Sequence, residues 1–300
     1  MKQLTASFIG LLVLQTLSSS SFAGGPSRIE GTDGNTPVIF ENPSVTLHVE
    51  NGDLGPIMNA AAIPLLEEAL ALWNDIGTST ISLSLDHALL DLDVDETNVE
   101  DYLPSLNYTD LHDDDGLNPV IFDNDGKIVE QYFGLAQSNT VLGFTHTIID
   151  VTQARFIEGF IVLNGNTIHD DLEFKLTFAH EAAHFFGLDH TQVNINNEES
   201  FAELPFFCFT TRSENYPLMY PVACRNSETL HPDDISAASA LYPSATFNDN
   251  YGILEGHFMD EAGAAITGAN IWVENTTTGD TYSSVSDYLK QGNGFYRLYI

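Results

Sequence analysis

Residues 180–190 read HEAAHFFGLDH and place three histidines and one glutamate within eleven positions. Residues 180–187 also form the last part of a longer segment, DLEFKLTFAHEAAHFFG (171–187). The acidic first turn and the apolar content of this segment predict a helix that begins at Asp170 or Asp171. On such a helix His180 and His184 project from one face, about one turn apart. Two imidazoles at that spacing can reach one metal ion at about 2.0–2.1 Å.

A catalytic zinc ion takes three protein ligands and keeps one position open, so a third ligand is needed. Gly187 can adopt the left-handed conformation that ends a helix and turns the chain back, which lets His190 reach the same ion. Glu181 lies beside the pair, where it can hydrogen-bond a metal-bound water without being a ligand, as a general base does. The alternative is a helix whose histidines are satisfied inside a core, and the added glycine and third histidine disfavour it.

With these residues the sequence resembles the metzincin zinc peptidases, whose signature is HExxHxxGxxH. The sequence GLDH at residues 187–190 most resembles the corresponding motif in the matrixin branch of that family. A metzincin also carries a methionine turn beneath the zinc, and YPLMYP supplies it at Met219. LHPDDISAASALYP resembles the last matrixin helix and EEALALWND the first, so the resemblance spans roughly residues 36–245.

This resemblance implies an α+β fold: a metzincin-type, twisted and mostly parallel sheet with an active-site helix, and a small lower subdomain after the helix. The domain would cover residues 37–245 and bind zinc through His180, His184 and His190. A protein or peptide substrate would lie extended and pair with an edge strand, for which GFIVLNGN (159–166) is the candidate. The residues after the methionine, namely Tyr220, Pro221 and Val222, would form a wall of the pocket for the residue that follows the cleaved bond.

Alternating or clustered apolar residues predict the other elements of this domain. PLLEEALALWNDIG (64–77) predicts a helix with Pro64 in its first turn. PVIFDNDGKIVEQYFG (119–134) predicts a strand, a tight turn and a second strand. Further strands are expected in VIFENPSVTLHVENG (38–52), STISLSLD (79–86), VLGFTHTIID (141–150) and FIEGFIVLNGN (156–166).

The chain is strongly acidic, with a formal net charge of −34. No lysine or arginine lies between Arg28 and Lys127, whereas 21 acidic residues do. The negative electrostatic potential of so acidic a chain repels nucleic acid and anionic membranes. The acidic residues either form a solvated surface suited to salt or bind calcium, and Asp123 and Asp125 in DNDG are the calcium candidates. An ordinary Asp/Gly turn is the competing interpretation of that motif, because Gly134 occupies the position where an EF-hand loop has glutamate.

The N-terminus has the features of a secretory signal peptide, with Lys2, an apolar run and a small-residue site that ends at Ala23. Residues 1–23 are therefore expected to be removed from a secreted or extracellular protein, and residues 24–36, rich in Gly, Ser and Pro, to form a flexible lead. No other run is apolar and long enough for membrane insertion. In an oxidising compartment Cys208 and Cys224 are expected to form a disulfide, a free thiol being the alternative.

The C-terminal part, residues 250–300, has short apolar runs separated by Gly, Asn and Asp turns, which predicts an all-β sandwich module. It resembles the carboxypeptidase-regulatory-like, transthyretin-type sandwiches, which usually carry one or two further strands, so we expect a truncated module. A spacer or binding role is implied rather than chemistry.

These observations and the resemblance leave two functions open for the protein, one catalytic and one not. One is a secreted zinc endopeptidase in which Glu181 acts as the general base of peptide-bond hydrolysis. The other is a non-catalytic surface adhesin or binding protein built on a metzincin scaffold, against which the intact Glu181 argues. A thermolysin-like enzyme, with a distant glutamate as third ligand, is made unnecessary by His190. The sequence does not indicate the natural substrate or the oligomeric state.

Overall fold

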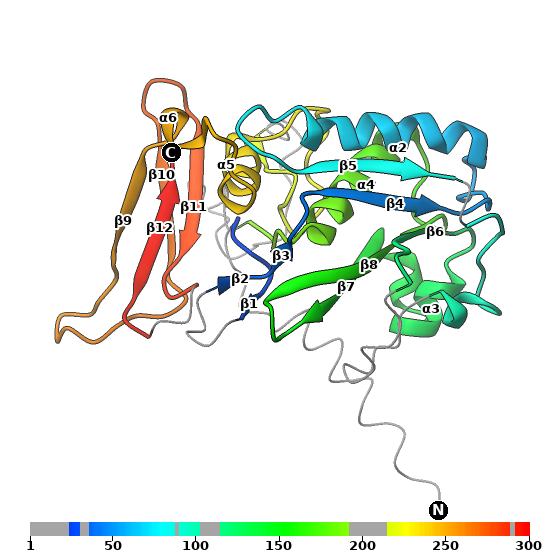
Figure 1. Ribbon diagram of the computed structural model, residues 1–300, viewed down its shortest axis with the longest axis horizontal. Coiled ribbons are helices and arrows are strands. Elements are labelled where there is room, and N and C mark those ends of the chain that lie inside the picture. The colour runs from blue at the N-terminus through cyan, green and yellow to red at the C-terminus, as the bar shows by residue number, and fades with distance from the viewer. Residues whose placement is uncertain (1–23, 31–35, 88–89, 103–114, 192–214, 289–291) are drawn as a thin grey trace, which may run out of the picture.

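The computed structural model describes residues 24–30, 36–87, 90–102, 115–191, 215–288 and 292–300. In these residues the chain forms an α+β fold, with a larger unit of sheet and helices followed by a smaller all-β unit (Figure 1). Within the described part of the chain, no helix combines the length and the apolar character that crossing a bilayer requires.

The larger unit is built on one six-stranded sheet in the order β3-β8-β6-β4-β5, with β7 paired to β8. Every neighbouring pair is parallel except β7 and β8, which are antiparallel. The prediction of an α+β fold with a mostly parallel sheet is therefore confirmed. The strands are β3 (Ile39–Phe40), β4 (Ser44–Val49), β5 (Ser82–Asp86), β6 (Pro119–Asp123), β7 (Gly143–Asp150) and β8 (Arg155–Asn164).

The edge of this sheet differs from the prediction for residues 159–166. That segment belongs to β8, which has β3 and β6 on one side and β7 on the other. Residues 151–154 turn the chain so that β7 and β8 form a hairpin, and β7 pairs with no second strand among the described residues. The edge strand is therefore β7, and the assignment of residues 159–166 to the edge is wrong.

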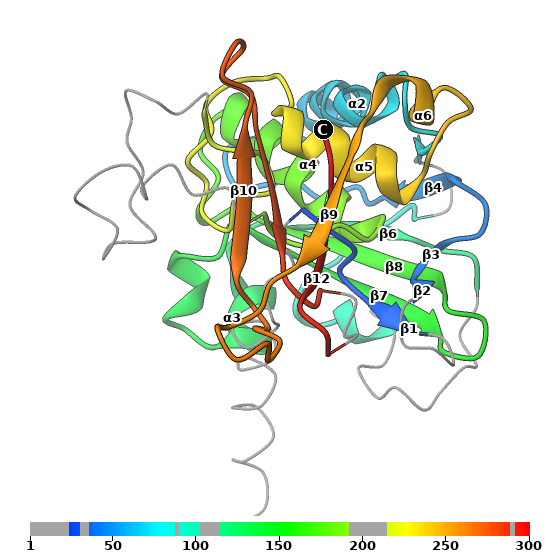
Figure 2. The same cartoon turned by 90° about the vertical axis from the view of Figure 1, so that its left-hand side faces the viewer.

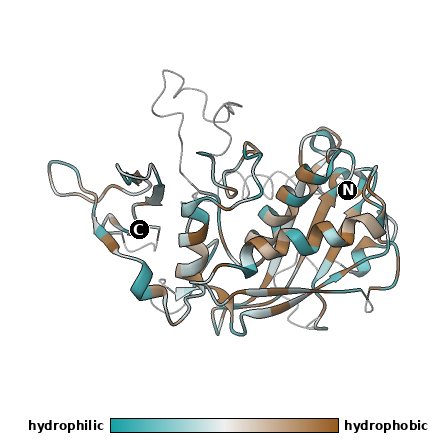
Figure 3. Ribbon diagram, turned by 90° about the horizontal axis from the view of Figure 1, so that it is seen from above, coloured by the Kyte–Doolittle hydropathy of each residue, from teal (hydrophilic) through white to brown (hydrophobic). Residues whose placement is uncertain are grey.

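Hydrophobic residues on the two faces of β8 alternate between two cores. Ile161 and Leu163 belong to the main core, which the sheet shares with helices α2 and α4, whereas Phe160 and Val162 belong to a smaller core on the opposite face. Brown and teal segments alternate along the helices in Figure 3, as expected of helices that bury one face. The helical elements of this unit are α2 (Asn59–Asn74), η1 (Val99–Asp101), α3 (Lys127–Phe133), η2 (Gln137–Asn139) and α4 (Asp171–Phe185).

Two helices depart from the sequence prediction. Residues 127–133, predicted as a second strand, form α3, and their apolar positions 128, 129, 132 and 133 suit one face of a helix as well as a short strand. Tertiary packing decides between the two, because Ile128 and Val129 are buried in the smaller core. Helix α2 begins five residues before Pro64, at Asn59, whose N–H donates to Asp53 Oδ1 at 2.7 Å.

The described residues of the N-terminal lead make hydrogen bonds to the turn after α4. Ser27 N donates to Gly187 O at 2.7 Å, and Asp189 N donates to Gly25 O at 3.0 Å. Two short strands, β1 (Ile29–Glu30) and β2 (Thr36–Pro37), follow and pair with each other. No local sequence pattern reveals the contacts with residues 187–189. The flexibility of the lead stays a prediction.

The C-terminal unit consists of two separate antiparallel two-stranded sheets, β10–β11 and β9–β12, in agreement with the all-β prediction (Figure 2). It lies against helix α5, which stands between it and the large sheet (Figure 1). Ser236 Oγ on α5 donates to Tyr299 O at 2.6 Å, and Ser283 N on β11 donates to Asp233 Oδ1 at 2.8 Å. The elements are α5 (Pro232–Leu241), α6 (Phe247–Asn250), β9 (Ile253–His257), β10 (Asn270–Glu274), β11 (Thr281–Val285) and β12 (Phe295–Tyr299).

Candidate metal centre

Helix α4 carries the first two histidines and has the ends that its sequence predicts. The side chain of Asp170 caps it by accepting a hydrogen bond from Glu173 N at 2.9 Å. After the helix, Gly187 has φ +105°, a conformation that disfavours any side chain. A Cβ at this position would also lie 2.7 Å from Phe156 Cε2. The chain therefore reverses at Gly187, and the reversal returns His190 to the helix.

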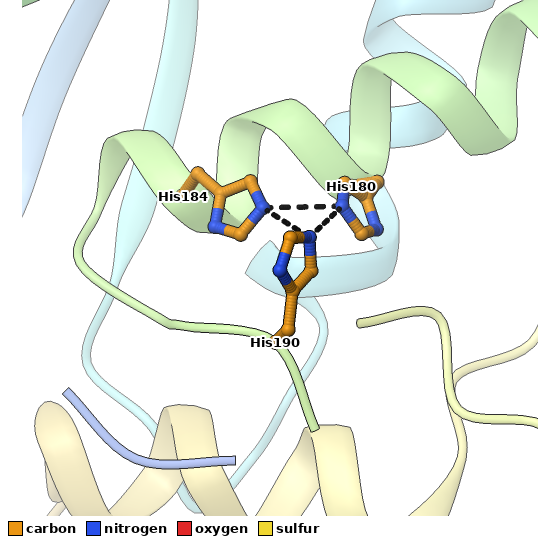
Figure 4. Close-up of side chains that lie close together, drawn as sticks. All are labelled: His180, His184 and His190. Atoms are coloured by element: carbon orange, nitrogen blue, oxygen red, sulfur yellow. Dashed lines mark hydrogen bonds between the residues drawn. The ribbon is translucent and has the colours of Figure 1, made fainter. Parts of the chain in front are cut away.

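The three histidines converge on one point (Figure 4). Nε2 of His184 lies 3.1 Å from Nε2 of both His180 and His190, and the remaining pair of Nε2 atoms is 3.3 Å apart. Nitrogen ligands at 2.0–2.1 Å from a tetrahedral zinc ion are separated by about 3.3 Å. The triangle thus has the size that one such ion requires.

Hydrogen bonds to backbone carbonyls fix the tautomers of two rings. Nδ1 of His180 lies 2.7 Å from Leu218 O and Nδ1 of His184 lies 2.8 Å from Leu188 O. A carbonyl oxygen only accepts, so each Nδ1 carries the hydrogen and each neutral ring turns an Nε2 lone pair toward the centre. Two lone pairs cannot hydrogen-bond to each other, but a cation can bind both. Among the described residues, this is the one group of three or more His, Cys, Asp or Glu side chains that could hold a metal ion.

Burial keeps these imidazoles neutral. It lowers the pKa of His180, lowers that of His184 to about 3 with a further contribution from His180, and lowers that of His190 well below its ordinary value. A metal ligand must be the neutral imidazole, so this environment selects the form that binds.

Glu181 lies next to His180 with its side chain buried. Burial raises the pKa of its carboxyl to about 7, and a hydrogen bond from the Thr145 hydroxyl opposes that rise. Thr145 Oγ1 is 2.8 Å from Oε2 and 3.0 Å from the backbone oxygen of Glu181. A carboxyl group that titrates near neutral pH can both accept and return a proton there.

The segment around Met219 connects the two halves of the histidine site. Leu218 O accepts from His180, and Met219 O accepts from Thr191 N at 2.8 Å, directly after the third histidine. The Asp234 carboxylate on α5 accepts from Leu218 N at 2.7 Å and from Met219 N at 3.1 Å. The buried methionine is thus tied to both segments that carry the three histidines, at the place where the sequence predicts the methionine turn.

The residues after the methionine are placed in different environments. Tyr220 is buried against Tyr216, with ring centroids 5.0 Å apart, and burial raises its pKa to about 12. Pro221 is exposed and Val222 is half-buried. Their role as a pocket wall stays a prediction.

The predicted disulfide lies partly outside the described residues. Cys224 is disulfide-bonded. Cys208, the other cysteine of the chain, lies within the range 192–214 that the structure does not describe. Its pairing with Cys224 therefore stays a prediction.

Asp123 and Asp125, the calcium candidates, have partners within the fold. Asp123 Oδ2 accepts from Val129 N, in the first turn of α3, at 2.8 Å, and Asp125 Oδ2 pairs with Lys127 Nζ at 2.6 Å. The DNDG motif forms a turn that leads into this helix. Calcium binding by these carboxylates stays a prediction.

The sequence motif identified the three histidines and Glu181, but it did not indicate Thr145 or the link between Asp234 and the methionine turn. Thr145 is 36 positions from Glu181, and no local signal connects them. No protein-family model matches the chain, and a search of curated proteins finds no match. What the site does is therefore inferred from its own residues.

Proposed function

We propose that this protein is a secreted, zinc-dependent endopeptidase of the metzincin type. The observation that carries the proposal is the triangle of Nε2 atoms, 3.1–3.3 Å on a side, beside a buried carboxyl group. Three neutral imidazoles are a ligand set suited to zinc, and they leave a fourth position for water. The signature in residues 180–190, Met219 and the mostly parallel sheet support the same family.

His180, His184 and His190 would hold the ion. Zinc, when bound, would polarise the carbonyl of the scissile bond and lower the pKa of the attacking water. Glu181 would accept a proton from that water and donate it to the leaving amine.

The proposed substrate is an extended peptide that adds to the edge strand β7. Main-chain groups of an edge strand bind an added strand in register, which orients a substrate independently of its side chains. The strand β7 packs on α4, so a peptide paired with it would pass beside the histidines. Tyr220, Pro221 and Val222 are proposed to shape the pocket for the residue after the cleaved bond.

Cleavage of casein or gelatin by the purified protein tests this proposal, with Glu181→Ala and a chelator as controls and zinc counted on both proteins. We expect the variant to lose cleavage while its zinc content stays near one per chain, because Glu181 is not a ligand. Zinc without cleavage across several substrates would favour the non-catalytic scaffold. A folded protein that binds no zinc would refute the proposal.

A further inference from the structure

A hydroxyl group on the edge strand holds the carboxyl group of Glu181. Thr145 Oγ1, on β7, is 2.8 Å from Glu181 Oε2 and 3.0 Å from Glu181 O. Packing of α4 on β7 makes these contacts between residues 36 positions apart. Within the described residues, the contact with Thr145 is the one hydrogen bond that the Glu181 side chain makes.

The two carboxyl oxygens of Glu181 are consequently in different situations. Oε2 is engaged by Thr145, whereas Oε1 accepts no hydrogen bond from the described part of the chain. The hydrogen bond from Thr145 therefore distinguishes the two oxygens.

Gly143 provides a second and independent indication that β7 accommodates this carboxyl group. A Cβ at Gly143 would lie 3.1 Å from Glu181 Cγ and 2.9 Å from Val162 O. Its φ is not in the left-handed region, so space rather than backbone conformation favours glycine here. Gly143 and Thr145 are two positions apart on a strand and face the same side. One leaves room for the glutamate side chain and the other donates a hydrogen bond to it.

We infer that Thr145 is a positioning residue that holds the carboxyl group of Glu181 in one orientation beside His180. Its hydroxyl lies within hydrogen-bond distance of Oε2, so rotation of the carboxyl group away from β7 would break this contact. The role in hydrolysis rests on the proposed function, whereas the hydrogen bond itself does not.

Kinetics of three variants test the role. Thr145→Val keeps the shape of the side chain without its hydroxyl, and Thr145→Ser keeps the hydroxyl. Thr46→Val is the control, because it removes a threonine hydroxyl from strand β4, where the partner is Ser84. We expect Thr145→Val to lower kcat about 10- to 100-fold, as for one lost hydrogen bond to a charged group, with KM and zinc content little changed. Thr145→Ser should restore most of kcat and Thr46→Val should leave it unchanged. A kcat for Thr145→Val within twofold of the unmodified protein would overturn the inference.

A second measurement needs no catalysis. The unfolding equilibrium constant of the metal-free protein is measured for Thr145→Val, Glu181→Ala and the double variant. A control cycle uses Thr46→Val in place of Thr145→Val. We expect Thr145→Val to change this constant about tenfold more when Glu181 is present than in the Glu181→Ala background. Coupling below twofold would overturn the inference even if Thr145→Val lost activity. If the unmodified protein cleaves no peptide, the proposed function fails while this cycle still decides whether Thr145 holds the carboxyl group.

Discussion

Replacing Gly187 with alanine tests whether the turn after α4 builds the histidine site. The backbone at φ +105° costs an alanine about 1–2 kcal/mol. The new Cβ would lie 2.7 Å from Phe156 Cε2, an overpacked contact that costs about 1–3 kcal/mol more because Phe156 is itself buried in the main core. We therefore expect Gly187→Ala to lower the free energy of unfolding by about 2–5 kcal/mol.

Gly279→Ala is the matched control. Gly279 has φ +82°, and a Cβ there would meet no atom within 4 Å, so only the backbone cost of about 1–2 kcal/mol applies. Urea denaturation of both metal-free variants gives the two free energies, and zinc titration gives the affinities. Gly187→Ala should also bind zinc more weakly, because relief of the contact moves the turn that leads to His190. Equal destabilisation of the two variants, with unchanged zinc affinity, would refute this account of the turn.

Tyr242 Oη donates to Phe186 O at 2.8 Å and accepts from Phe40 N at 3.0 Å. Tyr242→Phe leaves these two buried backbone groups unpaired and should lower the free energy of unfolding, measured in urea, by about 2–4 kcal/mol. A loss below about 0.5 kcal/mol would contradict this prediction. Burial, with a further contribution from the adjacent Asp234, raises the pKa of Asp233 to about 7, above its value in the unfolded chain. The folded protein therefore binds the carboxyl proton of Asp233 more tightly than the unfolded chain does. The free energy of unfolding should consequently fall as pH rises from about 4 to about 7. By linkage the fall reaches about 4 kcal/mol at most, and urea midpoints across this range should decline less steeply in Asp233→Asn; parallel profiles would show that Asp233 stays ionised. Asp234→Asn weakens the acceptor for the methionine turn and should speed zinc loss to a chelator, and an unchanged rate would count against that link.

Part of the fold could be predicted because its signals are local. The cap at Asp170, the acidic first turn and Gly187 mark both ends of α4 in the sequence itself. The alternation in STISLSLD likewise locates β5. Where the local pattern suited two structures, as in residues 127–133, burial of Ile128 and Val129 in the smaller core decided for a helix.

Strand order could not be predicted in the same way. Residues 159–166 and β7 carry similar apolar runs, and either could lie at the edge of a sheet. Pairing partners come from distant parts of the chain, so the burial of β8 between β6 and β7 is a property of the assembled sheet. The hydrogen bonds of residues 24–30 have the same origin, since their partners are the backbone groups of residues 187–189.

The sequence by itself determined the histidine site, because ligands four and six positions apart on a helix and its glycine turn are set by the geometry of a single segment. Only the tertiary structure decided how that site is completed. The carbonyl of Leu218 orients His180, Asp234 holds the turn at Met219, and Thr145 reaches Glu181 from another strand. Each of these contacts joins residues more than a dozen positions apart, and such contacts form only when packing of the whole core brings their backbones together.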